Sequence, residues 1–124
     1  MTPSAESADR IRDLLHRNLQ EVFGEADPDR RRRALAELWT EDAVLYAPPG
    51  AVVGQAAIDA FAGDLRATHP QFVYTPSGAP QALHNAGRLA WGSGLPGQPP
   101  AYTGSDVIIV RDGRIAALYV FLDG

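Results

Sequence analysis

The chain has 124 residues, no cysteine, and a net charge of -4 from 11 basic and 15 acidic side chains. This length suits one domain of ordinary size, so we expect a single domain over residues 1–124. The lack of cysteine excludes disulfides, thiolate metal sites and cysteine nucleophiles. A negative charge repels nucleic acids and anionic membranes, and no stretch approaches the roughly 20 apolar residues of a membrane span. We expect a cytoplasmic protein without nucleic-acid or membrane partners.

Two helices are predicted at the start of the chain. Apolar side chains recur every three or four residues over residues 11–23, and Gly24 then ends the first helix. Asp27 as the N-cap and Pro28 in the first turn begin the second helix, which should end at residues 40–42. Four consecutive arginines in its first turns are expected to be exposed to solvent, because consecutive helical residues cannot share one face.

A short strand and a third helix are expected next. The apolar residues 43–47 predict the strand, which a loop of prolines and glycine ends. The third helix should lie between Gly54 and Pro70, because a proline at that point interrupts helical hydrogen bonding.

From residue 71 onward the sequence predicts an antiparallel sheet. Four β segments are expected, at about residues 71–76, 82–92, 101–111 and 114–123. Asp112 and Gly113 form a strong hairpin signal, because a two-residue type I′ turn needs positive φ at both positions. Helices that precede an antiparallel sheet indicate an α+β fold.

The last two strands indicate a homodimer. Residues 107–110 and 116–122 do not alternate with polar residues, so both faces of their sheet should be covered. The helices of so short a chain can cover one face. We therefore expect the outer sheet face to contact a second copy of the chain.

Two segments carry a resemblance to a known family. The sequences LWTEDAVLYAPPGAVVGQAAIDAF (38–61) and TGSDVIIVRDGRIAALYVFLDG (103–124) resemble the nuclear transport factor 2-like superfamily and its SnoaL-like branch, over most of residues 9–124. The resemblance implies a cone-shaped α+β barrel of the cystatin-like type, with three N-terminal helices on a curved sheet around an apolar pocket. A hydrophobic small molecule is the ligand that it implies. Members include ketosteroid isomerases, polyketide cyclases, limonene-epoxide hydrolases and scytalone dehydratases.

Most catalytic residues of these relatives are missing here. The general base of a ketosteroid isomerase would fall on Ala47, and its tyrosine on Asn18 or Leu19. An acid of limonene-epoxide hydrolases would fall on Val120. The retained residue is Asp106, which resembles the carboxylic acid of the isomerase oxyanion hole.

Asp106 is also prominent without the resemblance. It directly precedes the apolar residues 107–110, so its carboxyl group should lie in a partly dry environment that raises its pKa. Such a group acts as a proton donor or base, or it is neutralised by a partner. The alternative is that Asp106 caps a backbone group or pairs with Arg88.

Side chains alternate between the two faces of a strand, and this alternation together with the resemblance places further side chains around Asp106. The expected ligand contacts are Tyr46, Phe61, Leu89, Trp91, Tyr102, Ile108, Leu118 and Val120. Trp91 and Tyr102 are expected to form an aromatic wall, with Tyr46 near the mouth of the pocket. Taken singly, an aromatic residue of this kind is more often part of an ordinary core than a ligand contact, and the whole set around an acid is the more suggestive feature.

The three histidines are too scattered for a metal site, and neither a metal nor a cofactor is expected. His16 and His69 are expected at the surface or at helix caps. His84 should lie on a sheet strand and could assist Asp106 in catalysis. It has the opposite parity from Trp91, however, so it reaches the pocket only if a β-bulge intervenes.

Two functions remain open from the sequence. One is a cyclase, isomerase or hydratase that acts on a hydrophobic carbonyl compound, with Asp106 as acid or base and His84 or a tyrosine assisting. The other is a non-catalytic ligand-binding or accessory protein of the same fold. The missing base at Ala47 favours the binding protein, whereas the retained Asp106 favours the enzyme.

Overall fold

The computed structural model describes residues 6–123, which form an α+β fold of helices on a six-stranded sheet. In chain order the elements are α1 (Ala8–Asn18), the π-helical segment η1 (Leu19–Phe23), α2 (Pro28–Leu38), β1 (Trp39–Ala47), β2 (Gly50–Val53), α3 (Gln55–Thr68), β3 (Val73–Leu83), β4 (Ala86–Gly94), β5 (Tyr102–Arg111) and β6 (Arg114–Leu122). The expected fold class is confirmed. None of the helices in this part of the chain is long and apolar enough to cross a membrane.

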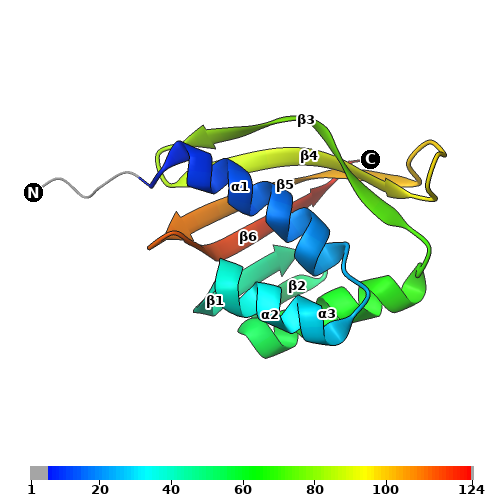
Figure 1. The fold of residues 1–124 in the computed structure, drawn as a ribbon, viewed down its shortest axis with the longest axis horizontal. Coiled ribbons are helices and arrows are strands. Elements are labelled where there is room, and N and C mark those ends of the chain that lie inside the picture. The colour runs from blue at the N-terminus through cyan, green and yellow to red at the C-terminus, as the bar shows by residue number, and fades with distance from the viewer. Residues whose placement is uncertain (1–5, 124) are drawn as a thin grey trace, which may run out of the picture.

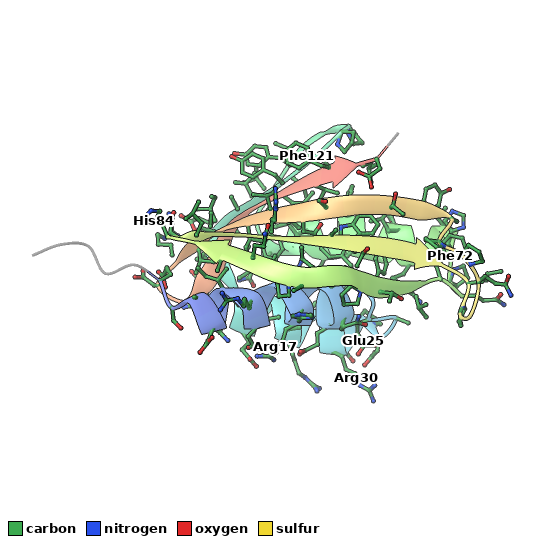
Figure 2. All side chains as sticks on the ribbon, turned by 90° about the horizontal axis from the view of Figure 1, so that it is seen from above. Arg17, Glu25, Arg30, Phe72, His84 and Phe121 are labelled. Carbon is green, nitrogen blue, oxygen red and sulfur yellow. The ribbon has the colours of Figure 1, made fainter. Side chains whose placement is uncertain are left out.

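The sheet is curved and mostly antiparallel. Its strand order is β2-β1-β6-β5-β4-β3, and β1 with β6 is its one parallel pair. Helix α1 runs diagonally across the strands β3 to β5, whereas α2 and α3 lie near β1 and β2 (Figure 1). Phe121 lies on the opposite side of the sheet from α1 and α2 (Figure 2). The helices therefore cover one face of the sheet.

The apolar stripe of the first helix forms the centre of the core. Ile11, Leu14 and Leu15 are almost fully buried, and α1 packs mainly on β3 and β4. Trp39 is also fully buried, and its indole Nε1 donates a hydrogen bond of 2.9 Å to Oδ1 of Asn18. Asn18 therefore joins the end of α1 to the start of β1.

The secondary structure differs from the sequence predictions in three places. The second helix ends at Leu38 instead of at residues 40–42, because Trp39 is already extended and begins β1. Strand β2 was not predicted; it pairs with β1 across the proline-glycine turn. The predicted strand 82–92 was wrong, because the chain reverses between Leu83 and Ala86.

The arginine run is not wholly exposed. Arg31 is buried, and its Nε lies 2.6 Å from Oδ1 of Asp59 on α3. It also donates a hydrogen bond to the backbone carbonyl of Glu25. A buried charge needs such partners, and this ion pair links α2 to α3. The exposed-face prediction was wrong for this residue.

Gly87 provides the close contact between β4 and α1. A Cβ atom at this position would lie 2.4 Å from Cγ2 of Ile11 and 3.0 Å from Cδ1 of Leu15. Both distances are shorter than a normal carbon contact, so the helix and the strand approach each other only because Gly87 lacks a side chain.

We expect Gly87→Ala to lower the free energy of unfolding by about 1–3 kcal/mol, because overpacking forces the helix and the strand apart. Urea denaturation would measure the change. The cost should be smaller in an Ile11→Ala background, since both substitutions act on one contact. Equal costs in the two backgrounds would contradict the packing explanation.

Candidate functional site

A cavity of about 450 Å³ lies between the helices and the sheet. One wall comes from η1, through Leu19 and Phe23, and another from the turn after β1. The last turns of α3 and the inner faces of β3 to β6 complete it. Phe72 lines the cavity, and its label in Figure 2 shows at which end of the sheet the cavity lies. The lining is mostly apolar, so its few polar groups decide what it can bind.

Asp106 is the carboxylate in this lining. It lies on the inner face of β5, opposite Leu89 on β4 and Val120 on β6, and it is 4% exposed. Its Oδ1 accepts a hydrogen bond of 2.9 Å from the indole Nε1 of Trp91. This is the one side-chain hydrogen bond of the carboxyl group within residues 6–123. Burial raises the pKa of Asp106 from 3.8 to about 7, and the Trp91 bond opposes part of that rise.

The alternative pairing of Asp106 with Arg88 is not present. Arg88 is opposite Val107, on the other face of the sheet, and it donates a hydrogen bond of 2.7 Å to Oε1 of Gln81. Asp106 is therefore a buried acid without a cationic partner in the described part of the chain.

Gly104 makes room for the indole that holds Asp106. A Cβ atom on Gly104 would lie 2.8 Å from Cζ2 of Trp91 and 2.5 Å from the backbone oxygen of Phe121. Only a residue without a side chain allows the Trp91 ring to lie across β5. The glycine thus helps to set the direction from which Nε1 reaches Asp106.

A second polar group lies close to Trp91. Tyr74 on β3 contacts Trp91 edge-to-face at 5.6 Å and Phe23 at 6.5 Å between ring centroids. Burial raises the pKa of the Tyr74 hydroxyl, and a hydrogen bond with the Ser93 side chain opposes part of the rise. Tyr74 is directly opposite Ser93 in the sheet. The inner part of the cavity therefore combines a carboxyl group with two hydroxyl groups.

The outer part of the cavity has a different character. The His69 ring stacks on Phe72 with centroids 4.3 Å apart, and its Nε2 lies 3.5 Å from the Tyr102 hydroxyl. Arg66 donates hydrogen bonds to the backbone oxygens of Phe72 and Pro70. Tyr102 is 51% exposed, so this end opens to solvent.

The predicted ligand contacts divide into three groups. Phe61, Trp91, Tyr102 and Val120 line the cavity together with Asp106. Three others, Leu89, Ile108 and Leu118, are almost fully buried in the core and do not line it. Tyr46 does not line it either; it stacks on Tyr119 at 4.7 Å. The prediction that these four residues, Leu89, Ile108, Leu118 and Tyr46, contact the cavity was therefore wrong.

His84 is not in the cavity. It lies in the two-residue turn between β3 and β4, exposed and with a φ of 53°. Figure 2 places it at the opposite end of the sheet from Phe72. The expected strand position was wrong because the chain turns at His84 and Asn85 instead of continuing. His84 is therefore not a candidate for assisting Asp106.

Sequence reasoning also missed part of the lining. His69 was expected at the surface or at a helix cap, and it is the C-cap of α3; its place in the cavity lining was not predicted. The other lining residues that were not predicted are Leu19, Phe23, Ala47, Pro48, Pro49, Leu65, Arg66, Thr68, Phe72, Tyr74 and Ser93. Parity could have found Ser93, two residues after Trp91 on the same strand. Within residues 6–123, no group of three or more His, Asp or Glu side chains could hold a metal ion.

Comparisons with known proteins agree with this architecture. The profile of the SnoaL-like domain family matches residues 16–118. A proposed isomerase of the SnoaL-like family from Agrobacterium tumefaciens is 26% identical, with a TM-score of 0.86, over 94% of this chain and 99% of that chain. A proposed SnoaL-like polyketide cyclase from Jannaschia is 14% identical, with a TM-score of 0.78, over 99% and 92%. A proposed ketosteroid isomerase from Kribbella flavida is 18% identical, with a TM-score of 0.72, over 94% and 80%. The comparison with curated proteins gives no match.

The raised pKa of Asp106 predicts a pH-dependent stability. The folded chain keeps this proton up to a pKa of about 7, whereas the unfolded chain releases it near 3.8. Between these values the unfolded state binds fewer protons, so the free energy of unfolding falls as the pH rises. Each unit of pKa difference corresponds to about 1.4 kcal/mol, so the free energy of unfolding falls by up to about 4 kcal/mol, and the fall is complete above about pH 7.

Urea denaturation of the wild type and of Asp106→Asn, from about pH 4 to pH 8, would isolate this contribution. The stability of the wild type relative to the variant should fall as the pH rises. A constant difference would show that the carboxyl group is hydrated in the folded protein.

Proposed function

The chain belongs to the SnoaL-like family of the nuclear transport factor 2-like superfamily, and we propose that it binds a hydrophobic carbonyl compound with Asp106 against the carbonyl oxygen. The observation that carries this proposal is a buried acid in the wall of an apolar cavity, whose one side-chain hydrogen bond within residues 6–123 comes from an indole N–H. The cytoplasm remains the proposed location.

The chemistry of Asp106 fits a carbonyl ligand. With a pKa of about 7, its carboxyl group is largely protonated in mildly acidic solution and can donate a hydrogen bond. Trp91 Nε1 is bonded to Oδ1, so the O–H group is available to the ligand. If negative charge develops on the carbonyl oxygen, this bond strengthens in a site that excludes water. Asp106 would then act as the acid of an isomerase, cyclase or hydratase.

A non-catalytic binding protein is the second candidate. Ala47 lines the cavity at the position where the resemblance places the general base of a ketosteroid isomerase. An alanine cannot accept a proton, so that route to a carbanion is missing. The same cavity would then bind the carbonyl compound without converting it.

Asp106→Asn separates the two candidates, because it preserves the volume and the acceptor for Trp91 but removes the proton. With 2-tetralone as the probe, tryptophan fluorescence would measure binding, and NMR in D₂O would measure the exchange of its α-protons. For an enzyme, we expect the variant to slow exchange by about 100-fold or more, while the dissociation constant changes only a few-fold.

Asp112→Asn is the matched control, because Asp112 lies exposed in the β5–β6 turn with a φ of 53°, which asparagine also tolerates. The control should behave like the wild type. Binding without exchange in the wild type would favour the non-catalytic candidate. Failure of a panel of hydrophobic ketones to bind at all would contradict the proposal.

The proposal includes a homodimer that forms through the outer sheet face. Tyr46, Tyr119 and Phe121 are 39%, 39% and 58% exposed, and the first two stack on each other. Val107 and Ile109 on β5 lie between them and β4 and are only partly buried. Exposed apolar area of this kind favours association with an identical surface.

We expect Phe121→Glu to shift the protein toward monomers, because a carboxylate would be buried in the interface. Sedimentation velocity at micromolar concentration would measure the oligomeric state. Leu95→Glu is the control, since Leu95 is 45% exposed in the loop between β4 and β5, outside the strands of that face. A monomeric wild type would overturn the dimer.

A further inference from the structure

We infer that the natural ligand is an elongated apolar carboxylic acid, with its carbonyl oxygen at Asp106 and its carboxylate at the outer end of the cavity beside Arg66, His69 and Tyr102. The inference rests on the proposed binding of a carbonyl compound and adds the second functional group of that compound.

The two polar ends of the cavity are well separated. Asp106 and Tyr102 lie on the same strand and are four residues apart, so both side chains belong to one face of β5. At about 3.3 Å per residue, their Cα atoms are roughly 13 Å apart. Trp91, Val120 and Leu122 supply apolar lining in the same cavity. A ligand that reaches both ends must therefore be elongated and mostly apolar.

The outer end carries the positive charge of Arg66. Arg66 forms no ion pair with any carboxylate of residues 6–123, and the hydrogen bonds of its guanidinium go to two neutral backbone oxygens. Its Nε is buried and has no hydrogen-bond acceptor. Most other arginines of the described chain form ion pairs, and none of the remaining unpaired ones lines the cavity. Arg66 is therefore a cation that lines the cavity without a counter-ion among residues 6–123.

Two further hydrogen-bonding side chains line the cavity together with Arg66. The Tyr102 hydroxyl and the His69 ring contact each other at 3.5 Å, and both line the cavity. A carboxylate accepts hydrogen bonds from hydroxyl and imidazole groups, and these bonds are stronger than bonds between neutral partners. The carboxyl group of the lining, Asp106, lies at the other end, so it does not repel an anion here.

One feature of the fold opposes an anion at this end. Helix α3 ends at Thr68, and the C-terminus of a helix carries a partial negative charge of about half a unit. Arg66 lies in the last turn of this helix and carries a full positive charge. The full charge of Arg66 therefore exceeds the partial charge of the helix terminus.

Three matched probes would test the inference: 2-tetralone, its 6-carboxylate and its neutral 6-carboxamide. Isothermal titration calorimetry would give their dissociation constants. For the wild type we expect the carboxylate to bind about tenfold more tightly than 2-tetralone, and the carboxamide to gain little. The advantage of the carboxylate should shrink as NaCl is added, because salt screens a partly exposed ion pair.

Variants of Arg66 identify the source of the preference. Arg66→Gln should abolish the advantage of the carboxylate and leave the affinity for 2-tetralone within a few-fold, whereas Arg66→Lys should keep most of it. Because Arg66 also holds the backbone of Pro70 and Phe72, its replacement could unfold the end of α3. Tyr102→Phe avoids this risk, and it should weaken the carboxylate a few-fold more than it weakens 2-tetralone. Asp106→Asn should leave the preference unchanged.

The outcomes distinguish this inference from the proposed function. Equal or weaker binding of the carboxylate, together with measurable binding of 2-tetralone, would overturn the inference and leave the function standing. Equal gains from the carboxylate and the carboxamide would also overturn it, because they would indicate a neutral polar group. If none of the probes bound the wild type, the proposed carbonyl site itself would be contradicted.

Discussion

The carboxyl group of Asp106 is held in an apolar environment by one hydrogen bond, and much of the site exists to make that arrangement possible. Trp91 supplies the bond of 2.9 Å, and Gly104 leaves the space in which the indole lies across β5. Taking a carboxylate out of water is unfavourable, which raises the pKa of Asp106 to about 7. A protein that gained nothing from this acid would be more stable with an apolar residue there. The burial is therefore better explained by function than by stability.

The sequence predicted the β5–β6 hairpin well and its neighbour poorly, for a physical reason. Asp112 and Gly113 both adopt positive φ, and this pair of residues is typical of a type I′ turn. The β3–β4 turn has the same length but uses His84 and Asn85, which have no glycine to mark them. Similarly, Trp39 follows the helical spacing of α2 yet is extended, and from β1 its indole donates a hydrogen bond to Asn18. Tertiary contacts decide such boundaries, and local patterns do not contain them.

Parity identified the inner face of the sheet but not the position of the cavity on that face. Asp106 and Ile108 share the face, and both were expected to contact ligand. Ile108 is fully buried in the core, whereas Asp106 meets open space. The difference depends on where the helices lie over the strands, and a strand sequence does not encode it. His69 was missed for the same reason: its helix end was predicted, but not the surface on which that end rests.

The helical layer itself explains why the cavity is at one end. Over Ile11 to Leu15 the α-helical spacing directs every apolar side chain against β3 and β4, and Gly87 allows the closest approach. After Asn18 the helix widens into the π-helical segment Leu19–Phe23, which changes the direction of successive side chains. Leu19 and Phe23 then line the cavity instead of filling it. The same continuous helix thus closes the core near the β3–β4 hairpin and leaves space beside Asp106. The packed end of the fold therefore lies under the α-helical part of this helix, and the binding end lies beside the π-helical segment.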